Sequence, residues 1–270
     1  MKVGFIGLGV QGKHLAINEA KAGFDLMAYD VRTEPLAELK AAGAKAARSA
    51  REVGAFADVI QVCVLDDAQV DEVVAGKDGV LSGAARDALI VVHSTIRPST
   101  IERLAAQAAR QGVELIDVPV SGSERGAREK TMSFMVGGGD AAFAKCKPLF
   151  EASGQKIVRT GPVGSGIRAK IAHQLVVCVN MLSAYEGMAM ADKAGLDRAV
   201  LMKVVGDGAA QSRMADGIMK HAIAASSNRV FHKDLRLCLE YAKELGIPAP
   251  GAALALEYLD KIVPPPEAKR

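Results

Sequence analysis

The chain opens with a short apolar run that passes directly into three glycines spaced as G-x-G-x-x-G, at Gly7, Gly9 and Gly12. In this motif the first glycine makes a tight turn after a buried strand, the second lets the backbone approach a pyrophosphate, and the third lets the next helix pack on the strand. Val10 and Gln11 lie in the same turn. Because a helix N-terminus favours anions, the opening residues predict a strand, turn and helix that hold phosphates.

The residues after the turn favour a dinucleotide site over an ordinary turn. A helical pattern over 14–22 ends at Gly23, and a second predicted strand, 25–29, is followed directly by Asp30. An acidic residue roughly 20 residues beyond the glycines accepts a hydrogen bond from a ribose 2′-hydroxyl. Since a carboxylate repels a 2′-phosphate, Asp30 favours NAD. Arg32 keeps NADP as the alternative, because a guanidinium pairs with phosphate.

Short apolar runs and helical patterns alternate through the first part of the chain, which predicts a doubly wound, mainly parallel α/β sheet of the Rossmann type. The predicted strands cover residues 3–6, 25–29, 44–47, 59–65, 89–93, 114–118 and 133–136. The predicted helices cover 14–22, 34–42, 49–56, 68–74 and 98–111. Because ligands bind at the carboxyl ends of such strands, Leu65, Thr95 and the stretch after Val118 join Asp30 as expected site residues.

From residue 164 onwards only helical patterns follow, over 167–193, 197–205, 213–223, 233–245 and 252–262. The first of them is about 40 Å long at 1.5 Å per residue, which is enough to lead into a second, all-α domain. We therefore expect a dinucleotide-binding domain over 1–163 and an all-helical domain for substrate binding and oligomerisation over 164–270, joined by a long interdomain helix.

Composition argues against several other classes of protein. The net charge of +3, the 4% of aromatic residues and the absence of tryptophan make nucleic acid an unexpected partner. The four cysteines are scattered without a C-x-x-C pair, which predicts a reducing compartment and no metal site. The start of the chain does not read as a signal peptide, and polar residues interrupt the apolar stretch 171–191. We expect a cytoplasmic protein without membrane contact and a disordered tail over 264–270.

Lys170 stands near the start of the long predicted helix, where it shares a face with His173 and Gln174 at i+3 and i+4. One cation and two hydrogen-bonding groups would then lie side by side. Burial beside a cofactor would lower the lysine pKa toward the range of an acid–base catalyst. A solvated lysine is the alternative interpretation.

Ser121, Gly122 and Ser123 follow a predicted strand end. Their hydroxyls and backbone N–H groups suit a small anion such as a carboxylate. A flexible surface loop rich in turn-forming residues is the alternative.

Motifs spread over nearly the whole chain resemble those of the β-hydroxyacid dehydrogenase family. They are GFIGLGVQG at the start, DVPVSGSERGA in the middle, GPVGSGIRAK ending in Lys170, and FHKDL at 231–235. The resemblance implies a Rossmann domain followed by a helical domain, and a homodimer or homotetramer built through the long helices. It also implies that Lys170 is the catalytic lysine and that Thr95 and Lys233 contact the cofactor.

The resemblance further implies that Ser121 and Gly122, with Ser123 at the third position, hold the substrate carboxylate. Three departures from the family pattern accompany it: the family usually has two asparagines where this chain has His173 and Gln174, a glycine in place of Ser123, and a methionine in place of Gln11. His173 and Gln174 are therefore expected substrate contacts that change which acid is bound.

Together these features predict a reversible oxidoreductase. It transfers a hydride between a nicotinamide cofactor and the hydroxyl-bearing carbon of a small β-hydroxy acid resembling 3-hydroxyisobutyrate, with Lys170 as general acid and base. One alternative is an NADPH-dependent reductase of a small aldehyde-acid or of an imine, although imine reductases of this fold usually lack the lysine. Another is a dinucleotide-binding protein without catalysis.

Overall fold

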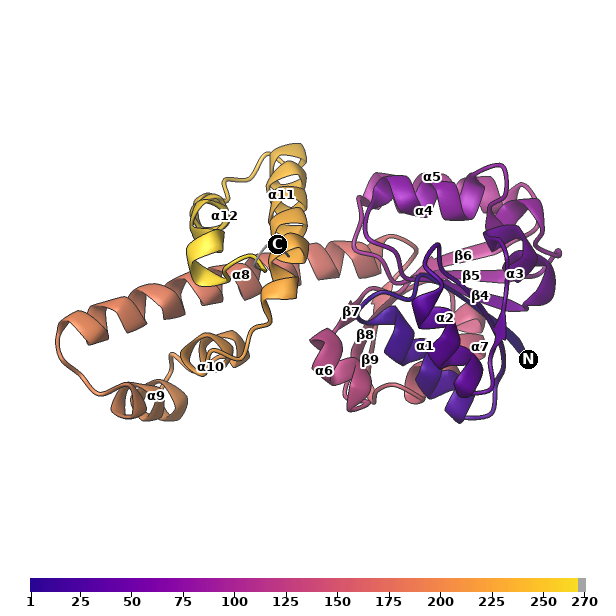
Figure 1. The fold of residues 1–270 in the computed structure, drawn as a ribbon. Coiled ribbons are helices and arrows are strands. Elements are labelled where there is room, and N and C mark those ends of the chain that lie inside the picture. Colours follow the sequence, from indigo (N-terminus) through magenta and orange to yellow (C-terminus); the bar gives the residue numbers. More distant parts are fainter. Residues whose placement is uncertain (267–270) are drawn as a thin grey trace. The chain divides into compact units, whose positions relative to one another are not determined.

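The N-terminal part of the chain is built on a nine-stranded sheet in the computed structural model, which describes residues 1–266 (Figure 1). The strand order is β3-β2-β1-β4-β5-β6-β8-β7, with β9 paired to β8. The strands are β1 (Lys2–Ile6), β2 (Asp25–Tyr29), β3 (Lys45–Ala46), β4 (Val59–Val62), β5 (Leu89–Val92), β6 (Glu114–Asp117), β7 (Val120–Ser121), β8 (Ser133–Gly137) and β9 (Lys156–Gly161). Of the predicted disordered tail, 267–270 lie outside the described residues.

Strands β1 to β6 pair in parallel, whereas β8 runs antiparallel to both β6 and β7. Every residue of β4 and of β5 is buried, as expected for strands covered on both faces. The sequence VIQV of β4 includes one polar residue, Gln61, which is only 1% exposed. The prediction of a doubly wound, mainly parallel sheet is confirmed.

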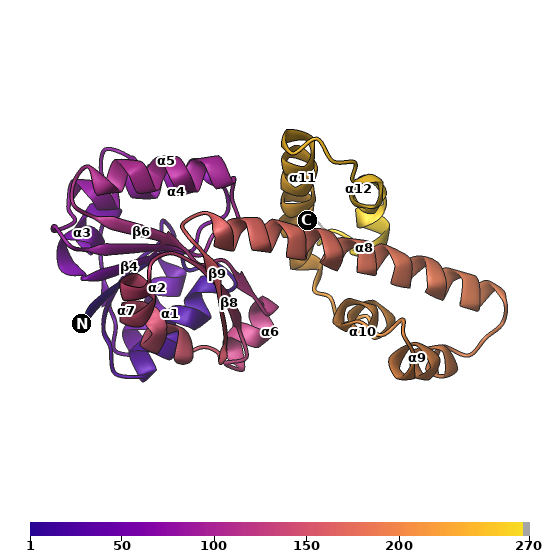
Figure 2. The same cartoon turned by 180° about the vertical axis from the view of Figure 1, so that it is seen from behind.

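Helices cover both faces of this sheet, with α4 and α5 on one face and α1 and α2 on the other (Figure 1, Figure 2). The helices are α1 (Gly12–Lys21), α2 (Glu34–Ala41), α3 (Ala50–Phe56), α4 (Asp67–Ala75), η1 (Val80–Ser82), α5 (Pro98–Ala109), α6 (Ser123–Arg128) and α7 (Asp140–Glu151). Side-chain caps fix two of the starts: Ser49 accepts a hydrogen bond from the Glu52 N–H, and Asp66 accepts one from the Gln69 N–H.

The chain divides into two compact units, Met1–Lys170 and Ile171–Arg270. The long helix α8 (Ser165–Lys193) begins in the first unit and continues into the second, followed by α9 (Arg198–Asp207), α10 (Arg213–Met219), η2 (Ala225–Ser227), α11 (Asn228–Glu244) and α12 (Pro250–Ile262). Fully buried Cys178, Met181, Leu235 and Leu259 are at the core of the second unit. In the described residues, no helix is both long and apolar enough to cross a membrane.

Several predicted boundaries are wrong. The strand predicted over 59–65 ends at Val62, so the following three residues form a loop. The helix predicted over 213–223 ends at Met219, because His221 takes up a left-handed backbone conformation with φ of 49°. The helix predicted from residue 233 begins at Asn228, whose side chain is held by Asp260. Helices α6 and α7 and strands β7 and β9 were not predicted at all.

Candidate nucleotide and substrate site

The turn after β1 can be built only with glycine at two of its three motif positions. Gly7 has a φ of +91°, and its N–H donates to the Tyr29 carbonyl at 3.0 Å. A Cβ at position 7 would lie 2.3 Å from the Cys63 carbonyl oxygen, and one at position 12 would lie 2.1 Å from the Gly7 carbonyl oxygen. Gly9 differs, since a Cβ there would have no atom of the described chain within 4 Å. Gly7 and Gly12 therefore shape the turn, while Gly9 faces open space.

The start of α1 lies directly behind this open space. Its N-cap residue, Gln11, makes no side-chain hydrogen bond to the helix, and its first turn contains no acidic residue. Val10 is 53% exposed beside it. The start of α1 has no side-chain cap, and the space beside Gly9 is open. The backbone N–H groups at this helix start would therefore hold the pyrophosphate of a dinucleotide.

Asp30 and Arg32, predicted as competing determinants of cofactor choice, are bound to each other. Oδ1 of Asp30 accepts from the Arg32 backbone N–H at 2.9 Å and from Nε at 3.0 Å. Oδ2 accepts from Nη2 of Arg32 at 3.1 Å and from the Leu8 N–H at 2.7 Å. Nη2 also donates to the Leu8 carbonyl at 3.1 Å. Since a carboxylate has about four acceptor positions, this set of donors occupies all of them.

The charges of Asp30 and Arg32 neutralise each other at the position where a cofactor ribose is expected. The side chain of Asp30 is 7% exposed and that of Arg32 55% exposed. Partial burial alone would raise the pKa of Asp30, but the hydrogen bonds from Arg32 and from the Leu8 backbone lower it overall. Asp30 is therefore ionised at neutral pH, with its charge shared by the guanidinium.

The loops after β4 and β5 are tied to each other. The Val64 N–H donates to Oγ of Ser94 at 2.9 Å, which joins the two strand ends. The Leu65 N–H donates to Oε1 of Gln69 at 3.0 Å. Thr95, the residue after Ser94, is partly buried at the end of β5. Leu65 and Thr95 thus both lie just past the carboxyl ends of adjacent parallel strands, as predicted from the strand pattern.

The predicted carboxylate-binding segment is a structured turn between β7 and α6. Ser121 pairs with Ser133 in the sheet, Gly122 has a φ of 147°, and Ser123 has a φ of 59° at the first residue of α6. A non-glycine residue in the left-handed region is strained. The glycine that the family usually has at the Ser123 position suits this backbone.

Asp117, at the end of β6, anchors the start of α8 and was not predicted as a site residue. Its Oδ1 accepts from the Gly164 N–H at 2.6 Å and its Oδ2 from the Ile167 N–H at 2.7 Å. Burial raises the pKa of this fully buried carboxyl, and the hydrogen bonds from the helix start partly offset that rise. Lys170 follows one turn later and is only 6% exposed.

In the second unit, a buried carboxylate organises three of the predicted residues. Asp234, 2% exposed on α11, accepts from Nε2 of Gln174 at 2.5 Å, and Nζ of Lys233 lies 2.8 Å from its other oxygen. Oε1 of Gln174 lies 3.1 Å from Nδ1 of His173. Because Oε1 only accepts, Nδ1 of His173 carries the hydrogen in this contact. Gln174 thus links His173 to Asp234 and Lys233.

Neither Asp117 nor Asp234 was singled out from the sequence, although both lie inside motifs that were. Each partner lies far along the chain, so local patterns do not reveal the pairing. In the described part of the chain, no group of three or more His, Cys, Asp or Glu residues is arranged to hold a metal ion.

Comparisons with known proteins agree with this arrangement. Residues 2–161 match the family model for the NAD-binding domain of 6-phosphogluconate dehydrogenase, and residues 164–264 match the model for the NAD-binding region of NADP-dependent 3-hydroxyisobutyrate dehydrogenase. The chain is 38% identical to 2-hydroxy-3-oxopropionate reductase of Escherichia coli strain K12, over 96% of this chain and 90% of that protein.

It is also 33% identical to 2-(hydroxymethyl)glutarate dehydrogenase of Eubacterium barkeri, over 96% of this chain and 88% of that protein. The crystal structure of 3-hydroxyisobutyrate dehydrogenase from Salmonella typhimurium superposes with a TM-score of 0.85 at 32% identity, covering 97% of this chain and 93% of that one. The family and the cofactor class inferred from the motifs are confirmed. The chain therefore belongs to the β-hydroxyacid dehydrogenase family and is an NAD(P)-dependent oxidoreductase.

Proposed function

We propose that this enzyme oxidises a small β-hydroxy acid reversibly, with Lys170 as the general acid and base and NAD as the preferred cofactor. The observation that carries the proposal is the buried Lys170, placed one turn after a helix start that a buried carboxylate anchors. Lysine side chains are rarely buried, because the charged ammonium loses its hydration there. The similarity to a 2-hydroxy-3-oxopropionate reductase supports acids of this class.

In the oxidation direction, Nζ of Lys170 accepts the proton of the substrate hydroxyl while the carbon–oxygen bond becomes a carbonyl. A nicotinamide cofactor held at the N-terminus of α1 would supply the hydride acceptor for oxidation and the hydride donor for reduction. In the reverse direction, Lys170 donates the proton to the new alkoxide oxygen. Lys170 therefore starts oxidation as a neutral amine and starts reduction as an ammonium.

The turn between β7 and α6 is proposed to hold the substrate carboxylate. The hydroxyls of Ser121 and Ser123 and the backbone N–H groups around Gly122 are donors, as an anionic carboxylate requires. The positive φ values of Gly122 and Ser123 shape the backbone of this turn. Fixing the carboxylate also fixes the carbon that loses the hydride.

NAD is favoured over NADP because the only guanidinium beside Asp30 in the described residues is already paired with it. A 2′-phosphate would bring at least one more negative charge next to a carboxylate whose pKa is lowered. To bind that phosphate, Arg32 would have to break its hydrogen bonds to Asp30. The unpaired carboxylate of Asp30 would then lie beside the phosphate and repel it.

The test is the Lys170→Ala variant, with Lys193→Ala as a matched control, since Lys193 is an exposed lysine on the same helix. Cofactor reduction with NAD and with NADP would be followed over a panel of β-hydroxy acids, beginning with 3-hydroxyisobutyrate. Loss of a general acid–base group should lower kcat about a hundredfold or more, while the dissociation constant of NAD stays unchanged. A Lys170→Ala enzyme that keeps the wild-type rate would remove this residue from the mechanism.

The same panel, run in reverse with aldehyde-acids and NADPH, distinguishes the reductase alternative. A protein that only binds the dinucleotide would gain thermal stability with NAD but would change no nicotinamide absorbance with any member of the panel.

We also propose that the enzyme is a homodimer or homotetramer. Met190 on α8 is 75% exposed, and Val200 and Val204 on α9 are 51% and 63% exposed. Large exposed apolar side chains close together in sequence support burial against another subunit. Sedimentation velocity would report the mass, and a monomer at micromolar concentration would refute the proposal.

A further inference from the structure

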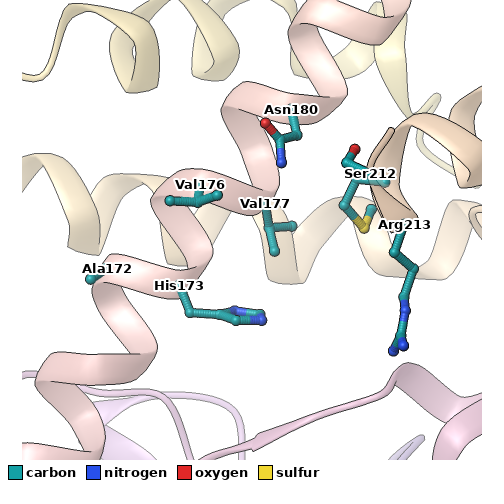
Figure 3. A pocket seen from close by; sticks show the side chains of 8 residues that line it. Ala172, His173, Val176, Val177, Asn180, Ser212 and Arg213 are labelled. Atoms are coloured by element: carbon teal, nitrogen blue, oxygen red, sulfur yellow. The ribbon is translucent and has the colours of Figure 1, made fainter. Parts of the chain in front are cut away.

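The second unit contains a cavity of about 450 Å³ between α8 and the start of α10 (Figure 3). Its lining includes His173, Val176, Val177 and Asn180 from α8, and Ser212 and Arg213 at the start of α10. At about 30 Å³ per water molecule, this volume equals about 15 waters, which is more than the seven heavy atoms of 3-hydroxyisobutyrate need. The cavity therefore has room for a larger acid.

The wall formed by α8 has polar groups at its ends and an apolar middle. His173, Val176, Val177 and Asn180 are spaced i, i+3, i+4 and i+7, so they form one stripe along the helix. The two valines suit methylene groups of a ligand, whereas the imidazole and the amide suit its polar ends. Such a wall favours a short aliphatic chain with an additional polar group.

Arg213 makes this cavity cationic. It is exposed, and within residues 1–266 it takes part in no ion pair or hydrogen bond, unlike Arg198, which is paired with Asp192. Among residues 1–266, no acidic side chain lines the cavity. In Figure 3 the imidazole of His173 extends from α8 toward the side of the cavity where the guanidinium of Arg213 lies. An arginine that faces a ligand-sized cavity without a carboxylate partner is suited to an anion.

One neighbour adds a donor to the same place. Oγ of Ser212 accepts the hydrogen bond that caps α10, from the Ala215 N–H at 3.0 Å, so its own hydroxyl hydrogen remains available to donate. The cavity thus offers a guanidinium beside a hydroxyl donor.

We propose that this cavity binds the second carboxylate of a β-hydroxy dicarboxylic acid, with Arg213 as the specificity-determining residue. The proposal rests on the proposed function, since it names the class of substrate for the same reaction. His173, at one end of the cavity lining, follows Lys170 by about 4.5 Å along the axis of α8. His173, at one end of the stripe, stands where the family usually has an asparagine.

The experiment compares two acids that differ by one carboxylate: 2-(hydroxymethyl)butanedioate and 2-(hydroxymethyl)butanoate. Wild-type enzyme should prefer the diacid in kcat/KM by about tenfold to a hundredfold, which corresponds to one charge-assisted pairing. In Arg213→Gln this preference should disappear through a higher KM for the diacid, while kcat/KM for the monoacid changes less than twofold. Arg110→Gln, which removes an exposed arginine that does not line the cavity, should leave both values unchanged.

Failure of this proposal and failure of the proposed function give different results. If the monoacid is turned over as well as the diacid, or if Arg213→Gln keeps the preference, the proposal is wrong and the dehydrogenase function stands. If neither of these acids nor any member of the β-hydroxy acid panel is turned over, the proposed function fails. Titration calorimetry of the diacid with the NAD-bound protein then tests the cavity by itself. Binding that Arg213→Gln abolishes supports the anion site, and absence of binding overturns it.

Discussion

Replacing Glu19 with glutamine should stabilise the protein more and more as the pH rises. Glu19, on α1, is fully buried, and its Oε2 lies 2.7 Å from Nε2 of Gln61. Oε1 of Gln61 lies 2.9 Å from Nε2 of His93, whose Nδ1 lies 2.7 Å from the Val118 carbonyl oxygen. Burial raises the pKa of Glu19 to about 8, against the hydrogen bond from Gln61, and lowers the pKa of His93 to about 4.

These pKa values make the whole chain of contacts neutral at pH 7. The Val118 carbonyl only accepts, so Nδ1 of His93 carries the hydrogen and Nε2 of the neutral ring accepts. Gln61 must then donate its NH₂ to Nε2 of His93 and accept the O–H of Glu19 with its oxygen. This orientation differs from the distances given above by exchange of the amide nitrogen and oxygen of Gln61. A glutamine at position 19 can donate its NH₂ in place of that O–H.

The sign of the pH dependence follows from the raised pKa of Glu19. The unfolded chain releases this proton near pH 4.5, whereas the folded protein holds it up to about pH 8. The contribution of Glu19 to the free energy of unfolding is therefore at its full value below pH 4.5 and is lost as the pH rises toward 8. At about 1.4 kcal/mol per pKa unit, wild type should lose about 2.5 kcal/mol relative to Glu19→Gln between about pH 5.5 and about pH 7.5.

Urea denaturation followed by far-UV circular dichroism at both pH values measures this difference. The titration of His93 is shared by both proteins and cancels in the comparison. Glu38→Gln serves as the control, because Glu38 is exposed and paired with Lys13, so its effect should change little with pH. A difference between wild type and Glu19→Gln that is equal at the two pH values would show that Glu19 is ionised in the folded protein and would refute the neutral network.

Three further changes test other parts of the molecule. Asp30→Ala releases Arg32 and should shift the ratio of kcat/KM values toward NADP by about tenfold or more, measured with both cofactors; an unchanged ratio would contradict the role of this pair. Asp117→Asn removes the charge that anchors α8 and should cost about 1–3 kcal/mol in urea denaturation and also lower kcat; wild-type stability would contradict the anchor. Ser123→Gly relieves the left-handed backbone and should stabilise by up to about 1 kcal/mol in thermal unfolding; a clear loss would contradict the strain.

What the sequence predicted correctly is local. The tight turn at Gly7 follows from spacing, since the steric demand is set by neighbours within the motif and by one adjacent strand end. The buried strands β4 and β5 follow from runs that are mostly apolar and rich in β-branched residues. Elements were missed where the pattern is mixed: β9 has the sequence KIVRTG and none of its residues is fully buried, so neither alternation nor an apolar run marks it.

What the sequence could not show is the pairing of buried polar groups across long separations. Asp117 meets the Gly164 N–H 47 residues later, and Gln174 meets Asp234 60 residues later. Asp30 and Arg32 are neighbours, yet as separate residues they indicated opposite cofactors, and only their mutual hydrogen bonds show that they act together. Hydrogen-bond partners depend on the fold, whereas motif spacing depends on the chain alone.

With the roles proposed above for Lys170 and Arg213, the two buried carboxylates would keep catalysis and substrate choice apart. Asp117 holds the backbone just before Lys170, and Asp234 holds the side chain of Gln174 just after it. The segment of α8 that carries the lysine is therefore fixed on both sides by groups that should not contact substrate. Arg213 belongs to α10 and is bonded to neither carboxylate, so changing it should alter which acid is accepted while Lys170 keeps its place on the helix.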